Sequence, residues 1–154
     1  MRAEIITIGD ELLIGQVVDT NSAWIAERLN EVGILLHQIT SVHDDREHIL
    51  KAIDEALNRA DIVLTTGGLG PTKDDITKKT LATLSGAEGW KRDEAQLEII
   101  HKILSARGLD VLEINLAQAD VPDTCNVIPN RLGTAPIMVF DFPEERFGHK
   151  ATLY

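Results

Sequence analysis

The first half of the chain alternates short apolar runs with segments whose apolar residues recur at helical spacing. Apolar runs at residues 3–8, 34–42 and 62–64 are typical of buried strands. The segments that follow them carry apolar residues every three or four positions, which indicates amphipathic helices: Ile25, Leu29 and Val32, then Ile49, Ile53 and Leu57, then Leu81 and Leu84. Short connections in a strand–helix alternation predict a mostly parallel sheet with helices on both faces.

The pattern is less regular beyond residue 85. It predicts a long helix over residues 90–107 with Asp93 as its N-cap and Gln96 completing a capping box, then a short helix and four further segments. These segments are a helix at 115–119, strands at 127–128, 137–142 and 150–154, and a hairpin turn at 143–148. Residues 12–18 are expected to form a loop or short strand, and residues 130–136 a turn that walls a pocket.

No linker or repeat interrupts the chain of 154 residues, so we expect a single domain over residues 1–154. Because the sequence stops inside a strand pattern, we expect a domain truncated at its C-terminus. Hydrophobic residues make up 44% of the chain, which is enough for a sizeable core.

The charge balance restricts the possible partners. Asp and Glu number 25 against 15 Lys and Arg, for a formal net charge of -10. Such a chain repels nucleic acid and anionic lipid, so neither is an expected partner. A single cysteine, Cys125, and no visible signal or membrane-spanning segment favour a cytoplasmic protein. Because Cys125 lies in a loop with no His nearby in sequence, we expect a buried or partly buried thiol and not a nucleophile. The five histidines show no zinc spacing.

The most informative stretch is the glycine-rich turn at residues 66–77. It follows an apolar run and precedes a helical pattern, so backbone N–H groups at its glycines and at the helix start suit a phosphate. The candidate ligand residues here are Gly67, Gly68, Gly70, Pro71, Thr72, Asp74, Asp75 and Thr77. Two carboxylates beside a phosphate favour a divalent cation between them. An N-cap and a tight turn explain the same residue types without any ligand.

Acidic pairs also follow the first two predicted strands. Asp10 and Glu11 follow the first strand, and Asp44 and Asp45 follow the second. The carboxyl ends of parallel strands share one edge of a sheet, so we expect these pairs to meet the turn there. Asp44 with Glu47 also fits a capping box, and loops are polar in general, so a purely structural explanation stays open.

Residues 3–16 and 66–77 closely resemble the N-terminal domain of the competence/damage-inducible CinA family, and residues 121–122 and 130–136 also fit its pattern. This domain is similar to the molybdopterin-binding fold of MogA, MoaB and the MoeA/gephyrin proteins. The resemblance implies a three-layer α/β/α sandwich, to which the residue pattern adds a mostly parallel sheet and a small β-hairpin near the C-terminus. Ile137 departs from the pattern, where the family usually has Gly.

The resemblance implies specific site residues. The two carboxylates of the MogA-like relatives fall on Asp44 and Asp75, as catalytic residues. The glycine cradle falls on Gly67, Gly68 and Gly70, and the hydroxyl on Thr77. We also expect Asp10 to contact the ligand, and Asp44, Asp74 and Asp75 to bind Mg²⁺, Mn²⁺ or Co²⁺.

Three functions remain open. The first is metal-dependent hydrolysis of a nucleotide-sugar pyrophosphate such as ADP-ribose, which is implied by the resemblance. The second is molybdopterin binding or a step of molybdenum-cofactor biosynthesis. The third is a non-catalytic regulatory domain. In each case we expect a homo-oligomer, a dimer or a trimer as in the relatives. The amidohydrolase domain of many CinA proteins has no counterpart in these residues.

Overall fold

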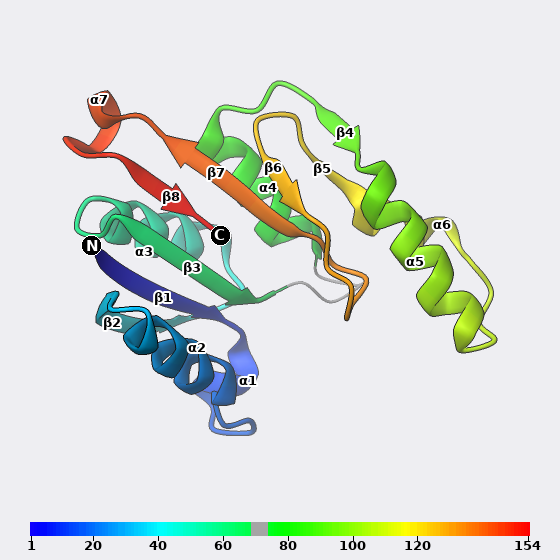
Figure 1. The fold of residues 1–154 in the computed structure, drawn as a ribbon, viewed down its shortest axis with the longest axis horizontal. Coiled ribbons are helices and arrows are strands. Elements are labelled where there is room, and N and C mark those ends of the chain that lie inside the picture. The colour runs from blue at the N-terminus through cyan, green and yellow to red at the C-terminus, as the bar shows by residue number, and fades with distance from the viewer. Residues whose placement is uncertain (69–73) are drawn as a thin grey trace. The chain divides into compact units, whose positions relative to one another are not determined.

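The structure is a computed structural model that describes the backbone of residues 1–68 and 74–154, and the side chains of these residues except Asp74 and Asp75. Its contacts divide it into two compact units. The first unit comprises Met1–Gly68 and Asp141–Tyr154, and the second comprises Leu69–Phe140. Figure 1 shows the elements of both.

The first unit is built on a parallel sheet. Its strands lie in the order β2 (Leu35–Val42), β1 (Arg2–Ile8), β3 (Ile62–Gly67) and β8 (Ala151–Leu153). Ile8 at the end of β1 lies opposite both Val42 of β2 and Gly67 of β3. The carboxyl ends of these three strands are therefore aligned at one edge.

Helices cover both faces of this sheet. The unit contains α1 (Asp10–Leu13), α2 (Thr20–Glu31), α3 (Arg46–Leu57) and α7 (Glu144–Phe147). The chain moves outward from β1 to β2 and then back past β1 to β3, so right-handed crossovers place α2 and α3 on opposite faces. In Figure 1, α2 lies in front of the sheet and α3 behind it. The predicted α/β/α layering and mostly parallel sheet are confirmed.

The core of the first unit is aliphatic with one buried ion pair. Ile5, Ile6 and Ile8 of β1 are buried, as are the predicted inward residues of α3. Glu4 on the same strand is only 1% exposed. Arg59 satisfies it with two hydrogen bonds, from Nε to Oε1 at 3.0 Å and from Nη2 to Oε2 at 2.9 Å. A buried carboxylate in this position depends on its partner.

The second unit contains the remaining elements. Its helices are α4 (Asp74–Ser85), α5 (Glu94–Ala106), α6 (Glu113–Leu116) and the 3₁₀-helix η1 (Ala117–Ala119). Its strands form two antiparallel pairs: β4 (Trp90–Arg92) with β5 (Asp120–Pro122), and β6 (Asn126–Ile128) with β7 (Ile137–Phe142). The β6–β7 pair is a small antiparallel hairpin, consistent with the small hairpin expected near the C-terminus, although the sequence pattern pairs residues 137–142 with 150–154. The last two residues of β7 belong to the first unit.

The predicted helix over residues 90–107 is wrong at its start. Trp90 pairs with Pro122 in the β4–β5 ladder, and α5 begins only at Glu94. Asp93 does cap it, since its carboxylate accepts from the Gln96 backbone N–H at 2.8 Å. The strand partner lies about thirty residues away in sequence, so nothing in the local pattern reveals it.

Two further segments differ from expectation. Residues 12–18 contain the end of the short helix α1 and turns, and no strand. The predicted hairpin turn at 143–148 contains the short helix α7, which ends at Gly148 with a left-handed φ of 75°. The following strand, β8, then lies parallel to β3.

Candidate functional site

The carboxyl edge of the first unit brings the first two acidic strand ends together. The backbone N–H of Gly9 donates to the Val42 carbonyl at 3.1 Å. Oδ1 of Asp10 then accepts from the Asp44 backbone N–H at 3.3 Å and lies 2.9 Å from Nδ1 of His43. Asp10 and Asp44 are therefore neighbours, as their positions after adjacent strands predict.

Asp45, and not Asp44, caps helix α3. Its Oδ1 accepts from the backbone N–H groups of Glu47 at 2.9 Å and His48 at 3.1 Å. The His48 hydrogen bond is the main reason why the pKa of Asp45 lies below its ordinary value. The capping box that pairs Asp44 with Glu47 is wrong, so capping does not explain why Asp44 is an aspartate.

A cleft opens beside the ends of β1 and β3. Its cavity volume is about 150 Å³, and it is lined by Thr7, Ile8, Glu11, Leu12, Val17, Val18, Asp19, Thr20, Asn21, Thr66 and Gly67. Nδ2 of Asn21 lies 3.5 Å from Oγ1 of Thr66 across it. All of these residues lie in the first unit. Glu11 and Asp19 make the cleft acidic.

Sequence reasoning missed part of this lining. No ligand role was predicted for residues 19–22, and Asp19 caps α2 by accepting from the Ser22 N–H at 2.9 Å. Capping requires only Asp19 and leaves the polar residues at positions 20 and 21 unexplained. The position of this segment after a strand-end carboxylate pair is the signal that would have found it.

Gly67 has a structural reason to be glycine. Its φ is 91°, and a Cβ atom would fall against the carbonyl oxygen of Ile8 on β1. Gly68 also has a positive φ, of 66°. The close approach of β3 to β1 therefore explains Gly67 without a ligand, although the same conformation leaves its backbone open to one.

The rest of the predicted turn is only partly described. Gly70, Pro71 and Thr72 lie outside the described residues. Asp74 and Asp75 are the first residues of α4, and their side chains are likewise outside the description. Thr77 is described and is 2% exposed, so its hydroxyl is buried. The ligand roles of these residues stay predictions.

The predicted metal site is not assembled by the described residues alone. Among them, no group of three or more His, Cys, Asp or Glu side chains is arranged to hold a metal ion. Asp10 and Asp44 lie next to each other at one edge, joined by the hydrogen bond from the Asp44 backbone N–H to the Asp10 carboxylate. Carboxylate oxygens suit Mg²⁺ or Mn²⁺, but these cations take about six ligands.

Two other expectations can be compared with the structure. Cys125 is a free, buried thiol, as predicted. No helix in the part of the chain that the structure describes is long and apolar enough to cross a membrane.

Comparison with known proteins identifies the class. The model of the family described as "Probable molybdopterin binding domain" matches residues 4–139. The chain therefore belongs to this family of molybdopterin-binding domains. Within it, the chain is a CinA-type N-terminal domain with a MoaB-like fold, which confirms the resemblance noted in the sequence.

The CinA-like relatives are longer. The chain is 44% identical over 138 residues to a CinA-like protein of Flavobacterium psychrophilum, and 48% identical over 140 residues to one of Cytophaga hutchinsonii. Each match covers 90% of this chain and 33% of the relative. The chain thus spans about a third of the length of these curated relatives.

Solved structures share the fold. The CinA protein from Thermoplasma acidophilum, described as having unknown function, aligns with a TM-score of 0.78 and 34% identity, covering 99% of this chain and 86% of that one. The tungsten cofactor synthesizing protein MoaB from Pyrococcus furiosus aligns with a TM-score of 0.59 and 22% identity, over 99% and 78% of the two chains. The second likeness supports the fold alone.

Proposed function

We propose that this chain binds a phosphorylated pterin of the molybdopterin type at the carboxyl edge of its parallel sheet. The observation that carries the proposal is the polar cleft beside the ends of β1 and β3 in a member of a molybdopterin-binding family. Ligands of open α/β sheets collect at this edge.

The cleft is suited to one end of such a ligand. A volume of about 150 Å³ is below the ~300 Å³ at which whole-ligand pockets begin, so the cleft accommodates part of the molecule. Its carboxylates at Glu11 and Asp19 repel a phosphate and accept hydrogen bonds from N–H groups. The pterin ring, which presents amino and amide N–H donors, is therefore the end that fits. The phosphate is then left for backbone N–H donors at Gly67 and Gly68.

Glu11 provides the test of this orientation. One carboxylate oxygen of Asp19 is already engaged in capping α2, whereas Glu11 lines the cleft from α1. Glu11→Gln replaces one acceptor oxygen with a donor NH₂ group at nearly constant shape. We expect anaerobic calorimetry with molybdopterin to show at least a tenfold weaker Kd, which corresponds to about 1.4 kcal/mol.

Glu27→Gln is the matched control. Glu27 lies on α2 in the same unit, with a side chain that is 66% exposed and paired only with Arg28 among the ion pairs described. Its substitution should leave the Kd unchanged. Equal affinities of the Glu11 and Glu27 variants would show that the ring does not occupy this cleft.

Metal-dependent hydrolysis of ADP-ribose is a second candidate. The contact between the Asp44 backbone N–H and Oδ1 of Asp10 favours it, because it brings two acidic residues to one sheet edge, where carboxylates attract a divalent cation. This candidate predicts that the chain releases AMP from ADP-ribose in the presence of Mg²⁺, Mn²⁺ or Co²⁺. The activity should be lost in Asp44→Asn and Asp75→Asn and retained in Asp110→Asn, a control at an exposed position. No turnover by the folded wild-type chain would reject it.

A further inference from the structure

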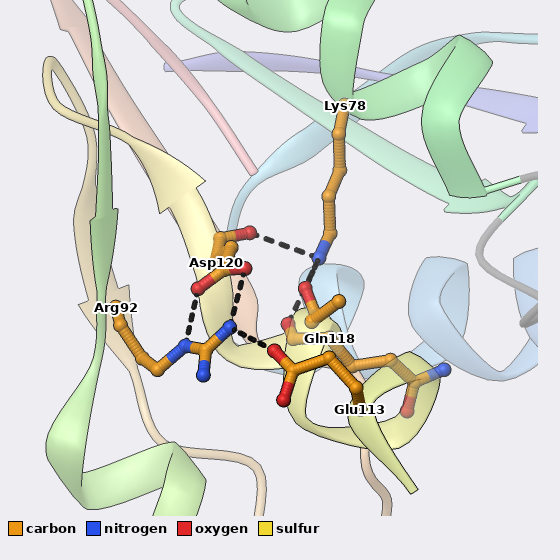
Figure 2. Close-up of polar contacts among 6 residues, drawn as sticks. Lys78, Arg92, Glu113, Gln118 and Asp120 are labelled. Atoms are coloured by element: carbon orange, nitrogen blue, oxygen red, sulfur yellow. Dashed lines mark hydrogen bonds and ion pairs between the residues drawn. The ribbon is translucent and has the colours of Figure 1, made fainter.

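Two cations of the second unit are engaged within that unit. Nζ of the buried Lys78 donates to the backbone carbonyls of Gln118 at 2.8 Å and Asp120 at 3.0 Å. Arg92 binds both carboxylate oxygens of Asp120, at 2.6 and 2.9 Å, and Oε1 of Glu113 at 2.9 Å (Figure 2). These contacts account for both cations without a ligand, so this network is structural.

The loop between α1 and α2 in the first unit exposes apolar side chains that no contact of this kind explains. Leu13, Ile14, Val17 and Val18 are all exposed, with Val17 at 52% and Val18 at 81%. Single apolar residues on a protein surface are ordinary, whereas a group of them beside a cleft is typical of a contact surface. These four residues occur within six positions of a chain that is otherwise strongly acidic.

Two of these residues belong to the ligand cleft. Val17 and Val18 line it, together with Leu12 and Ile8. Ile8 is completely buried in the sheet and Leu12 is half-buried, so the exposed apolar surface of the cleft comes mainly from the two valines. Ligand pockets combine apolar walls with a few polar groups that fix the orientation of the ligand. The valines supply the apolar part of this combination.

Backbone hydrogen bonds hold the two valines in place. The Glu11 carbonyl accepts from the N–H groups of Gln16 at 2.9 Å and Val17 at 3.2 Å, and the Val18 carbonyl accepts from the Thr20 N–H at 2.9 Å. The loop is therefore tied to α1 at one end and to α2 at the other. An apolar surface that is ordered before the ligand arrives loses little conformational entropy on binding.

We propose that Val17 and Val18 pack against the face of a planar, uncharged heterocycle in this cleft. The proposed function directs the N–H groups on the edge of the pterin ring to the carboxylates at Glu11 and Asp19, and these edge contacts leave the faces of the ring uncovered. Valine methyl groups gain dispersion contacts on such a face and remove apolar surface from water. The inference rests on the proposed function, since it requires the ring to occupy the cleft.

A matched pair of valines tests the inference. Val18→Thr keeps the shape of the side chain and replaces one methyl group with a hydroxyl, at a position too exposed to matter for folding. We expect anaerobic calorimetry with molybdopterin to show about fivefold weaker binding, and roughly tenfold or weaker in the double variant that adds Val17→Thr. Val32→Thr is the control, since Val32 is 71% exposed at the C-cap of α2 in the same unit. It should leave the Kd unchanged.

Neopterin, which carries the pterin ring without a phosphate, shows which end of the ligand the valines contact. Titrated into the ¹⁵N-labelled chain, it should shift the amide signals of Val17 and Val18. The valine substitutions should weaken neopterin and molybdopterin binding by the same factor, because both ligands present the same ring. Circular dichroism and sedimentation velocity check that each variant is folded and has the assembly state of the wild type.

Three results would overturn the inference. The first is wild-type affinity for molybdopterin in the folded double variant, and a change in assembly state at that affinity would show that the valines face a second copy of the chain instead. The second is an equal loss in Val32→Thr. The third is neopterin binding that is absent or insensitive to the substitutions in a chain that binds molybdopterin. Failure of the wild-type chain to bind molybdopterin is a separate outcome, because it rejects the proposed function itself.

Discussion

The buried pair of Glu4 and Arg59 gives the sharpest stability prediction. Glu4 is 1% exposed, and both of its carboxylate oxygens are bound by the Arg59 guanidinium at 3.0 and 2.9 Å. These bonds also raise the pKa of Arg59. Arg59→Met keeps the apolar stem of the side chain and removes both bonds, which leaves a charged carboxylate in the core.

The expected cost follows from the geometry. Removing one partner of a buried ion pair costs about 3–5 kcal/mol, and the lower end applies because the Arg59 side chain is 38% exposed. We therefore expect the free energy of unfolding to fall by about 3 kcal/mol. For a chain of this size, the corresponding drop in Tm is about 6–12 °C. Urea unfolding followed by circular dichroism measures the first quantity, and a thermal scan the second.

Two further variants complete this test. Arg28→Met removes an arginine that pairs with Glu27 and Glu31 on the exposed side of α2, and it should cost less than about 1 kcal/mol. Glu4→Gln combined with Arg59→Met removes the buried charge and should recover part of the lost stability. The reasoning is refuted if Arg59→Met costs no more than Arg28→Met, or if the double variant is as unstable as Arg59→Met alone.

Three other predictions follow from local features. Gly67→Ala should destabilise the chain by more than about 2 kcal/mol, because the positive φ and the Ile8 carbonyl both oppose a Cβ atom. Gly108 has a φ of 64° and open space around it, so Gly108→Ala should cost only about 1 kcal/mol. Urea unfolding measures the free energy of unfolding of both variants. Asp45 has a lowered folded-state pKa, so Asp45→Ala should reduce Tm at pH 7, and the difference from wild type should disappear as the pH falls through the lowered pKa. Burial raises the pKa of the Cys125 thiol, so its reaction with a disulfide reagent at pH 8 should be slow until urea unfolds the chain; fast reaction in the folded chain would contradict this.

The sequence predicted the strands and helices that are encoded by hydrophobic spacing within a single segment. The first unit follows from three apolar runs and from helices with a single apolar stripe, of which α3 is the clearest, since Ile49, Ile53 and Leu57 are all buried. The Asp10–Asp44 contact was also predictable, because adjacent parallel strands must bring their following residues together.

Long-range features were not predictable in this way. Strand β4 exists because residues 120–122 pair with it, and no pattern within residues 90–92 encodes that partner. Gln96 was expected to complete a capping box. Its buried side chain instead binds a distant turn, accepting from the Asn130 N–H at 2.8 Å and donating to the Gly133 and Thr134 carbonyls at 3.0 Å. A glutamine that bonds to backbone groups more than thirty residues away leaves no spacing signal.

The candidate site likewise contains some residues that local sequence patterns predicted and others that they did not. Motif spacing predicted the glycine turn and the acidic strand ends, whereas the polar lining of the cleft at Asn21 and Thr66 became apparent only when β1 and β3 were placed side by side. The packing of Gly67 against Ile8 shows in addition that a motif glycine can be required by the sheet itself.

Amide hydrogen exchange of the wild-type chain, with and without molybdopterin under anaerobic conditions, tests the central claim most directly. The account predicts that molybdopterin slows amide exchange at the cleft, in residues 7–21 and at Thr66 and Gly67, and leaves the exchange of α5 nearly unchanged. Binding that protects none of the cleft residues, or no binding at all by the folded chain, would contradict it.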